Sequence, residues 1–343
     1  MTEDARIGLE ACTSREYSPD VGPSSGLPTE TPYQEDLMKL STANVLFPLV
    51  FVLATATAFA QNNTCSSSAQ QMLNSCQLGA QSDYSLALSK CENESDPGKR
   101  DACRQQARAA LQDALASCNA QFPAREKICG FLGGRGWDPE IKPSDFSTFI
   151  NNPYFPLKPG TTFVYQARTA DGLKENRVAV THKTKTILGV VCVEVHDTVR
   201  VNGQLTEDTL DWYAQDKAEN VWYFGEDSEE LTGGRVSNLG GSWTAGVDGA
   251  EPGIIMEAHP KVGDPYRQEL LLDEAEDFAR VISLEEDLKV PFGAFNDCLK
   301  TEETSGVEPD ALEFKFYAPG IGVVFVNDIT GNEKDFLVNI IAE

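Results

Sequence analysis

The chain has 343 residues, 41% of them hydrophobic, so it is long enough for two domains and apolar enough for packed cores. Acidic residues outnumber basic ones by 53 to 28, which gives a formal net charge of −25. Because phosphate backbones are bound by clustered lysine and arginine, this balance argues against a nucleic-acid partner. A surface of this charge keeps a protein soluble and repels anionic lipid headgroups, although it could attract cations or basic partners.

The first sixty residues indicate export. A short basic start precedes an apolar run over 44–59 that ends in Ala-Phe-Ala, which fits signal peptidase. The sequence therefore predicts a signal peptide over 38–60, cleaved between Ala60 and Gln61, and a secreted or periplasmic protein. A membrane anchor is the alternative, but the apolar run is barely long enough to span, so no membrane span is expected in the mature chain. Residues 1–37 are either a disordered leader or the result of a start codon assigned too early.

Six cysteines follow the signal in a palindromic pattern. Their sequence separations are 11, 15, 12, 15 and 11 residues, and the centre of symmetry is Pro97. At 3.6 residues per turn, 11 residues are close to three helical turns and 15 are close to four. The pattern predicts an antiparallel helical hairpin over 61–132 that is closed by three nested disulfides: Cys65–Cys129, Cys76–Cys118 and Cys91–Cys103.

The positions between these cysteines continue one helical face at spacings of three and four residues. Most are small or apolar, and only Arg125 breaks the pattern: Ala69, Met72, Ala80, Tyr84 and Ala87 on the first helix, and Ala107, Ala110, Ala114, Phe122 and Arg125 on the second. Such a seam would let two helices approach as closely as a disulfide requires, and Asp96-Pro97-Gly98 supplies the turn. A thiolate site for Cu(I) or zinc is the alternative, but the region has no Cys-x-x-Cys pair and no histidine.

A linker over 133–150 leads to an acidic β domain over 151–343. Alternating and β-branched segments predict about ten antiparallel strands, among them one long strand over 186–201 that ends at Asn202-Gly203. The segments 209–216 and 220–227 predict another hairpin. The fold class expected is therefore α+β: a disulfide-stapled helical hairpin followed by a curved antiparallel sheet, or half-barrel.

Three segments of this domain resemble a broad family of uncharacterised exported bacterial proteins. They are NPYFPLKPGTTFVY, VPFGAFNDCLKT and FYAPGIGVV, and the resemblance covers about residues 152–340. The strand order also resembles half-barrels such as the periplasmic lipoprotein carriers. That resemblance implies a concave face suited to apolar ligands, although a shared fold alone is a weak guide to function.

Two further cysteines, Cys192 and Cys298, fall in predicted strands. A fourth disulfide between them is the prediction for an exported protein. Two buried free thiols that behave as small apolar residues are the alternative.

Candidate ligand-binding residues lie in the 209–227 hairpin and in a Gly- and Pro-rich loop over 247–264, which could cap a pocket or simply pack as a loop. They are Trp212, Tyr213, Trp222, Tyr223, Ile254, Ile255 and Met256. Several carboxylates surround the aromatic pairs, and they could act on or bind a ligand or simply face water. No hydrolase, zinc-protease, nucleotide-binding or EF-hand motif is present, and there are only three histidines, so no catalytic residue, cofactor or metal site is predicted.

Three functions remain open at this point. The first is a non-enzymatic binding protein for an apolar or amphipathic small molecule or lipid, which predicts a concave apolar face. The second is a structural or adhesive cell-surface module, which predicts a filled core. The third is a carboxylate-dependent hydrolase, which predicts two converging carboxyl groups, at least one with a raised pKa.

Overall fold

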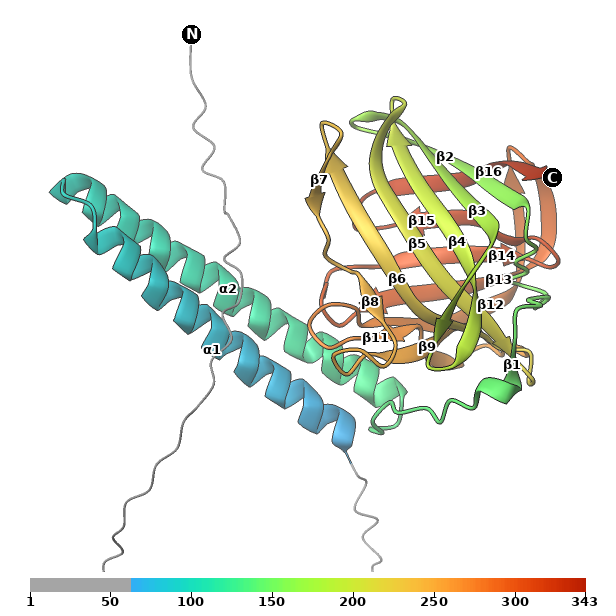
Figure 1. Cartoon of the computed structure of the whole chain (residues 1–343), viewed down its shortest axis with the longest axis horizontal. Coiled ribbons are helices and arrows are strands. Elements are labelled where there is room, and N and C mark those ends of the chain that lie inside the picture. Colours follow the sequence, from blue (N-terminus) through green and yellow to red (C-terminus); the bar gives the residue numbers. More distant parts are fainter. Residues whose placement is uncertain (1–62) are drawn as a thin grey trace, which may run out of the picture. The chain divides into compact units, whose positions relative to one another are not determined.

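The computed structural model describes residues 63–343, and the predicted signal peptide and the residues before it lie outside this range. The described residues form a helical hairpin followed by a nearly closed antiparallel sheet (Figure 1), so the predicted α+β class is confirmed. The helices are α1 (Thr64–Glu92), α2 (Pro97–Phe131) and the short 3-10 helix η1 (Pro143–Asp145). None of the described helices is both long and apolar enough to cross a membrane.

Sixteen strands are described, and all belong to the sheet. In chain order they are β1 (Phe146–Ser147), β2 (Thr161–Thr169), β3 (Gly172–Ile187), β4 (Val190–Val201), β5 (Gln204–Asp216), β6 (Val221–Thr232), β7 (Arg235–Asn238), β8 (Trp243–Thr244), β9 (Glu251–Met256), β10 (Pro265–Arg267), β11 (Glu269–Leu270), β12 (Asp277–Val290), β13 (Gly293–Ser305), β14 (Glu313–Ala318), β15 (Gly322–Asp328) and β16 (Glu333–Ala342).

The three predicted disulfides of the hairpin are confirmed. Cys65–Cys129, Cys76–Cys118 and Cys91–Cys103 join Cα atoms that are 5.5, 5.7 and 5.5 Å apart. The centre of the palindrome marks the start of α2: the Asp96 carboxylate accepts a hydrogen bond from the Lys99 backbone N–H at 2.8 Å, and Pro97 occupies the first turn. Disulfides of this kind are compatible with an extracytoplasmic location.

The alanine seam holds the two helices together, although not at every predicted position. Ala69, Ala80 and Ala107 are buried, whereas Ala110 is exposed. The small buried side chains allow the close helix approach that the disulfides need. Leu78 and Leu86 are exposed, so the isolated hairpin buries little apolar surface and depends on its disulfides.

Arg125, the residue that breaks the hydrophobic seam, attaches the hairpin to the sheet. Its side chain is 3% exposed and its Nε and Nη2 donate to the carboxylate of Glu276, which is 2% exposed, at 2.8–3.0 Å. Phe131 stacks on Phe278 of β12 at 5.5 Å between ring centroids. Together these contacts join the end of α2 to the sheet through one buried ion pair and one aromatic pair.

The sheet is ordered β10-β12-β13-β14-β15-β16-β2-β3-β4-β5-β6-β9-β11. In Figure 1, β3–β6 form the wall nearest the viewer and β12–β15 lie behind it. The two edges of the sheet meet at residues 265–270, since β10 pairs with β12 at one edge and β11 pairs with β9 at the other. Only Gln268 separates β10 from β11. The sheet is thus curved further than the predicted half-barrel.

Two sequence-based predictions about the strands are wrong. The predicted long strand over 186–201 is interrupted by a tight turn at Leu188 and Gly189, which have φ angles of 49° and 79° and separate β3 from β4. Glycine adopts such an angle without strain, and the adjacent β-branched residues had concealed the turn. The predicted loop over 247–264 contains a strand, β9, which pairs with β6 and β11.

The predicted disulfide between Cys192 and Cys298 is also wrong. Both are free thiols, fully buried in the core of the sheet. Cys192 lies on β4 and Cys298 on β13, and six pairing steps along the sheet separate these strands. Each side chain fills space as a small apolar residue.

Removal of the Arg125 guanidinium should destabilise the protein strongly. Arg125→Ala would leave the buried Glu276 carboxylate unpaired, a change that costs about 3–5 kcal/mol of unfolding free energy. Replacement of both partners, as in Arg125→Met with Glu276→Leu, should cost much less. Urea unfolding curves of both variants test this, with the exposed Arg108→Ala as the control. Equal losses in the single and double variants would show that the ion pair is not the source of the effect.

The two thiols should react only after unfolding. Burial raises the pKa of Cys192 to about 12 and that of Cys298 to about 11, so at pH 8 almost no thiolate is present. In a chain that starts at residue 61, we expect iodoacetamide to leave the native protein unmodified. The same reagent should label two cysteines in guanidinium without reductant. An unfolded chain without labelled cysteines would mean that a fourth disulfide exists.

Candidate functional site

A cavity of about 440 Å³ opens on the inner side of the sheet. Its apolar wall comes from strands on both sides of the barrel and includes Phe163, Tyr165, Val178, Ile255 and Val323. The other part of the lining is polar, with Lys174, Asn176, Asp197, Glu207, Glu313, Lys315 and Asp335. The cavity is therefore amphipathic, and its volume falls within the range of small-molecule sites.

Three buried oxygens in the polar part of the cavity accept no hydrogen bond. They are the Oδ1 atoms of Asn176 on β3, Asp197 on β4 and Asp335 on β16, and β2 lies between β16 and β3. A buried acceptor without a donor costs free energy, so native proteins rarely leave one unmatched. Three such acceptors around one cavity form a site that a molecule with hydrogen-bond donors would complement.

The two lysines in the cavity cannot supply these donors without giving up existing partners. Lys174 pairs with Glu333 and, at 3.3 Å, with Asp335 Oδ2, while Lys315 pairs with Glu303 at 2.7 Å and with Glu313 at 3.4 Å. Burial raises the pKa of Asp197 well above its ordinary value, and the nearby Asp211 and Glu207 add to this effect. The electrostatic environment of Asp197 thus favours a donor or a positive charge.

The structure brings two of the seven predicted binding residues to this cavity. Tyr213 and Ile255 line it, and Tyr223 stacks directly on Tyr213 with ring centroids 4.7 Å apart. Ile254 packs against the core from a partly buried position, and Met256 is fully buried in it. The ligand-binding role assigned to these residues stays a prediction.

The two tryptophans of the predicted set lie away from the cavity lining. Trp222 packs against Trp137 and Phe146, and its Nε1 donates to Asp216 at 2.8 Å. Trp212 lies beneath the ammonium group of Lys185, which is 3.3 Å from its ring centroid. Both rings support the fold through packing. The alternation of side chains along β5 could have separated Tyr213 from Trp212, since neighbouring residues of a strand face opposite sides.

The polar residues of the cavity were not predicted from the sequence. Asn176, Asp197 and Asp335 are far apart in the chain, and each sits in a segment whose alternation predicts a strand. Strand alternation places them on a face, but only the pairing of β16 with β2 and of β2 with β3 brings the three together. The one sequence feature that could have indicated these cavity residues is an acidic or amide side chain at a strand position where alternation predicts an inward side chain.

A second polar group lies inside the sheet, on β5 and β6. Tyr223 Oη is 2.5 Å from Asp211 Oδ1 and 3.0 Å from Glu226 Oε2. A phenol has one proton and can donate to only one of them, so the second contact is favourable when that carboxyl is protonated and donates to the phenol oxygen. Burial raises the pKa of Asp211 to about 7 and that of Glu226 to about 7. These two carboxyl groups thus retain a proton near neutral pH.

The carboxyl pair meets one of the two requirements for the predicted hydrolase. Its pKa values are raised, as a general acid requires. Neither Asp211 nor Glu226, however, lines the cavity of about 440 Å³. The pair is therefore best described as part of the polar interior.

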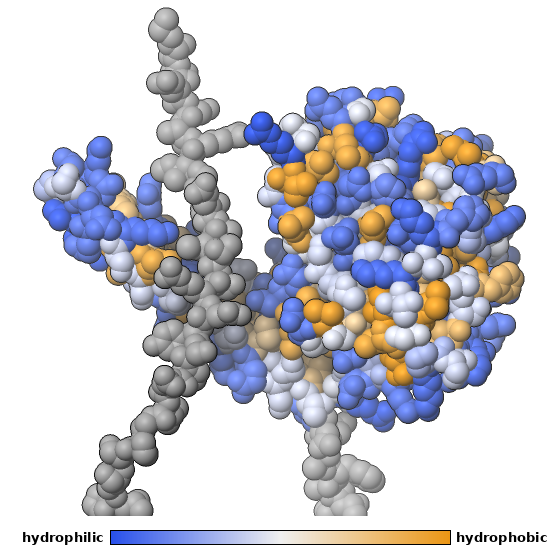
Figure 2. Space-filling view, viewed as in Figure 1, coloured by the Kyte–Doolittle hydropathy of each residue, from blue (hydrophilic) through white to orange (hydrophobic). Residues whose placement is uncertain are grey.

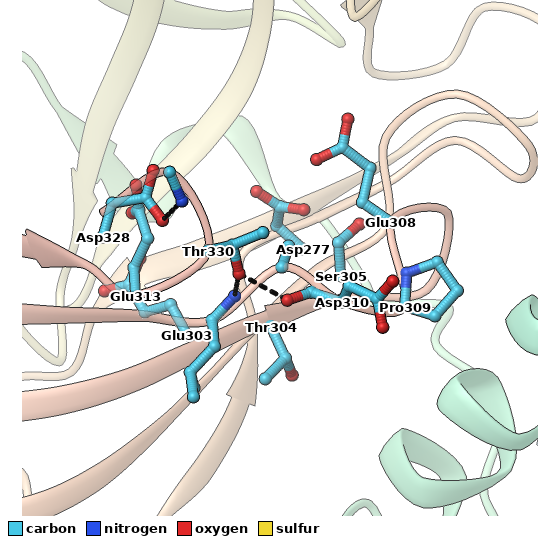
Figure 3. A pocket seen from close by; sticks show the side chains of 13 residues that line it. Asp277, Glu303, Thr304, Ser305, Glu308, Pro309, Asp310, Glu313, Asp328 and Thr330 are labelled. Carbon is cyan, nitrogen blue, oxygen red and sulfur yellow. Dashed lines mark hydrogen bonds between the residues drawn. The ribbon is translucent and has the colours of Figure 1, made fainter. Parts of the chain in front are cut away.

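A second cavity, of about 560 Å³, is strongly acidic (Figure 3). Asp277, Glu308, Asp310 and Asp328 are among its lining residues, and Thr330 Oγ1 donates to the Asp310 carbonyl at 2.5 Å. Across residues 63–343, no group of three or more His, Cys, Asp or Glu side chains is arranged to hold a metal ion. The carboxylates here contribute negative surface charge to a loop fixed by backbone and threonine hydrogen bonds.

Figure 2 shows how hydrophobic and hydrophilic residues are distributed over one face of the molecule. Apolar and hydrophilic residues alternate over the visible face, and the apolar ones form separate small groups. Small apolar groups scattered among polar residues are common on protein surfaces.

No family model and no curated protein matches the chain. A crystal structure of a "putative lipoprotein" from Parabacteroides distasonis aligns with 55% of this chain and 97% of its own, at 13% sequence identity and a TM-score of 0.31. A likeness this distant carries no argument about function. Membership of the exported bacterial family stays a prediction.

The stability of the protein should fall between about pH 5 and pH 7 because of the inner carboxyl pair. A carboxyl whose pKa is raised by folding keeps its proton to a higher pH in the folded chain, so its stabilising effect is complete at low pH and is lost as the pH rises through the folded pKa. One pKa unit corresponds to about 1.4 kcal/mol. Between pH 5 and pH 7, the free energy of unfolding of Asp211→Asn should therefore fall by about 2 kcal/mol less than that of the wild type.

Urea unfolding of the wild type and Asp211→Asn at pH 5, 6 and 7 measures the effect. The exposed Asp227→Asn on the same hairpin is the matched control, and its profile should run parallel to that of the wild type. A parallel profile for Asp211→Asn as well would show that Asp211 titrates alike in the folded and unfolded chains.

Proposed function

We propose that the protein binds an amphipathic small molecule in the cavity of about 440 Å³. The observation that carries the proposal is the set of three buried oxygens without donors, on Asn176, Asp197 and Asp335. A ligand whose polar end donates hydrogen bonds would satisfy them, and its apolar part would lie against Phe163, Val178 and neighbouring side chains. The site is thus suited to an alkyl or aryl compound with an ammonium or hydroxyl group.

Charge favours the ammonium form over a carboxylate. Four acidic side chains and two lysines line the cavity, and both lysines are already paired with carboxylates. A carboxylate ligand would place a further acceptor beside Asp197, whereas an ammonium would offset the burial of that carboxyl. A hydrogen bond to a charged group contributes about 1.5–3 kcal/mol, which corresponds to at least tenfold in affinity.

Isothermal titration with octylamine, octanol and octanoate tests this function in 0.15 M salt, which screens the acidic surface. We expect affinity to fall in the order octylamine, octanol, octanoate. Asp197→Asn should remove about tenfold of the preference for octylamine over octanol. Asp227→Asn, which makes the same change in net charge outside the cavity, should leave that preference unaltered.

A cavity-filling variant separates binding in the barrel from binding elsewhere. Val178→Phe should abolish octylamine binding while circular dichroism shows a folded sheet. Native mass spectrometry of protein purified without detergent should show a small bound mass that is lost on denaturation. Equal binding of all three probes, or undiminished binding by a folded Val178→Phe variant, would contradict the proposal and favour a structural module.

A further inference from the structure

A third cavity, of about 270 Å³, lies where the hairpin meets the sheet. The start of α1 and the end of α2 form one side of it, and β10, β11 and the residues that follow them form the other. All of these elements belong to one compact unit of the described residues. Cavities between packed elements of this kind are frequent ligand sites, and none of the functions discussed above uses this one.

The cavity is rich in arginine, although the chain as a whole has a net charge of −25. Arg125, Arg135 and Arg267 line it together with Glu251 and Glu276. Arg125 and Glu276 neutralise each other, and the Glu276 carboxylate also accepts the Asp273 backbone N–H at 2.9 Å. Neither oxygen of Glu276 accepts a hydrogen bond from Nε or Nη1 of Arg267.

Arg267 is the exceptional residue of this cavity. Its side chain is 6% exposed, and its Nε and Nη1 atoms are buried and donate no hydrogen bond to any described residue. Burial lowers the pKa of Arg267, but a guanidinium remains charged at any physiological pH. The carboxylates of Glu276, Asp277 and Glu269 partly offset the burial of its charge, but none of them accepts a hydrogen bond from Nε or Nη1. Buried donors without acceptors are unfavourable, and a bound anion would supply the missing acceptor.

The geometry points to a small organic carboxylate as that anion. Nε and Nη2 form one edge of the planar guanidinium, and a carboxylate at this edge can accept two parallel hydrogen bonds. The remaining wall of the cavity is largely apolar, with Trp137, Leu270 and Leu272 among its residues, and this favours an organic body over a bare inorganic ion. We propose that Arg267 binds the carboxylate of a small organic acid in this cavity, between the hairpin and the barrel.

The ligand would contact residues of both the hairpin and the sheet. Ala69 and Cys129 belong to the helices, whereas Arg267 belongs to β10. A ligand that binds only the assembled form raises its stability in proportion to the logarithm of ligand concentration. Carboxylate binding would therefore reinforce the attachment that the Arg125–Glu276 pair already provides.

Benzoate is the probe for the test, measured by isothermal titration and by the shift in melting temperature of the full mature chain. Benzamide is the uncharged isostere, and inorganic phosphate is the alternative anion. We expect benzoate alone to bind and to raise the melting temperature. Arg267→Gln should weaken benzoate binding by at least about tenfold, and Arg267→Lys, which keeps the charge but not the planar fork, should weaken it by less.

The control variant is Arg108→Gln, which removes one exposed positive charge of α2 away from the cavity. It should bind benzoate as the wild type does. If Arg267→Gln does not fold, Arg267→Lys decides the test. Unchanged benzoate binding by either folded Arg267 variant, equal binding of benzamide, binding of phosphate in place of benzoate, or no benzoate binding by the wild type at millimolar concentration would overturn the proposal.

Discussion

The closure of the sheet at Gln268 is the constraint on which the interior depends. Residues 265–267 pair with β12 at one edge of the sheet, and residues 269–270 pair with β9 at the other edge. One short segment therefore connects both edges of a sheet of sixteen strands. The Gln268 backbone N–H donates to the Asp277 carbonyl at 2.9 Å. A Cβ atom at residue 253 would overlap the backbone of Gln268, so the approach of β9 requires glycine there. Closure encloses the inner face of the curved sheet. Every polar side chain on that face then needs a hydrogen-bond or ion-pair partner inside the barrel.

Many of those inward side chains are carboxyl groups, and the enclosure satisfies them in two ways. Some are paired with a donor in place: Glu303 accepts from Thr301 at 2.7 Å and from Lys315 at 2.7 Å, and Glu269 accepts from Trp243 at 2.8 Å. Others, such as Asp211 and Glu226, keep a proton. The pKa values of Asp197 and Asp335 are raised as well, but their Oδ1 atoms have no hydrogen-bond partner in the described part of the chain, and both residues line the cavity. At the candidate site, buried acceptor oxygens therefore outnumber the hydrogen-bond donors that the described residues supply.

The sequence was most informative where the spacing of residues is itself geometric. The palindromic cysteines specify a helical hairpin because separations of 11 and 15 residues keep each arm on one face, and in the nested pairing the two partners of every bridge lie equally far from Pro97. Cys192 and Cys298 carry no such constraint, and export alone was a poor reason to pair them. The cavity could not be predicted because it depends on which strands become neighbours. Alternation assigns Asp197 and Tyr213 each to one face of its own strand, but it does not show that Asp335 lies close to them.

The one exception to the hydrophobic seam proved to be the residue with the largest structural role. Arg125 stands at a position where the hairpin alone would favour alanine, and its buried partner is Glu276, 151 residues later in the chain. A charged residue on an otherwise apolar face thus indicates a partner outside the local element, because a buried charge without a partner strongly destabilises the folded protein. Arg267 is subject to the same reasoning. It is as deeply buried as its neighbours, and although carboxylates of the chain lie near it, no described residue accepts a hydrogen bond from its Nε or Nη1, which is why we propose a bound carboxylate as their acceptor.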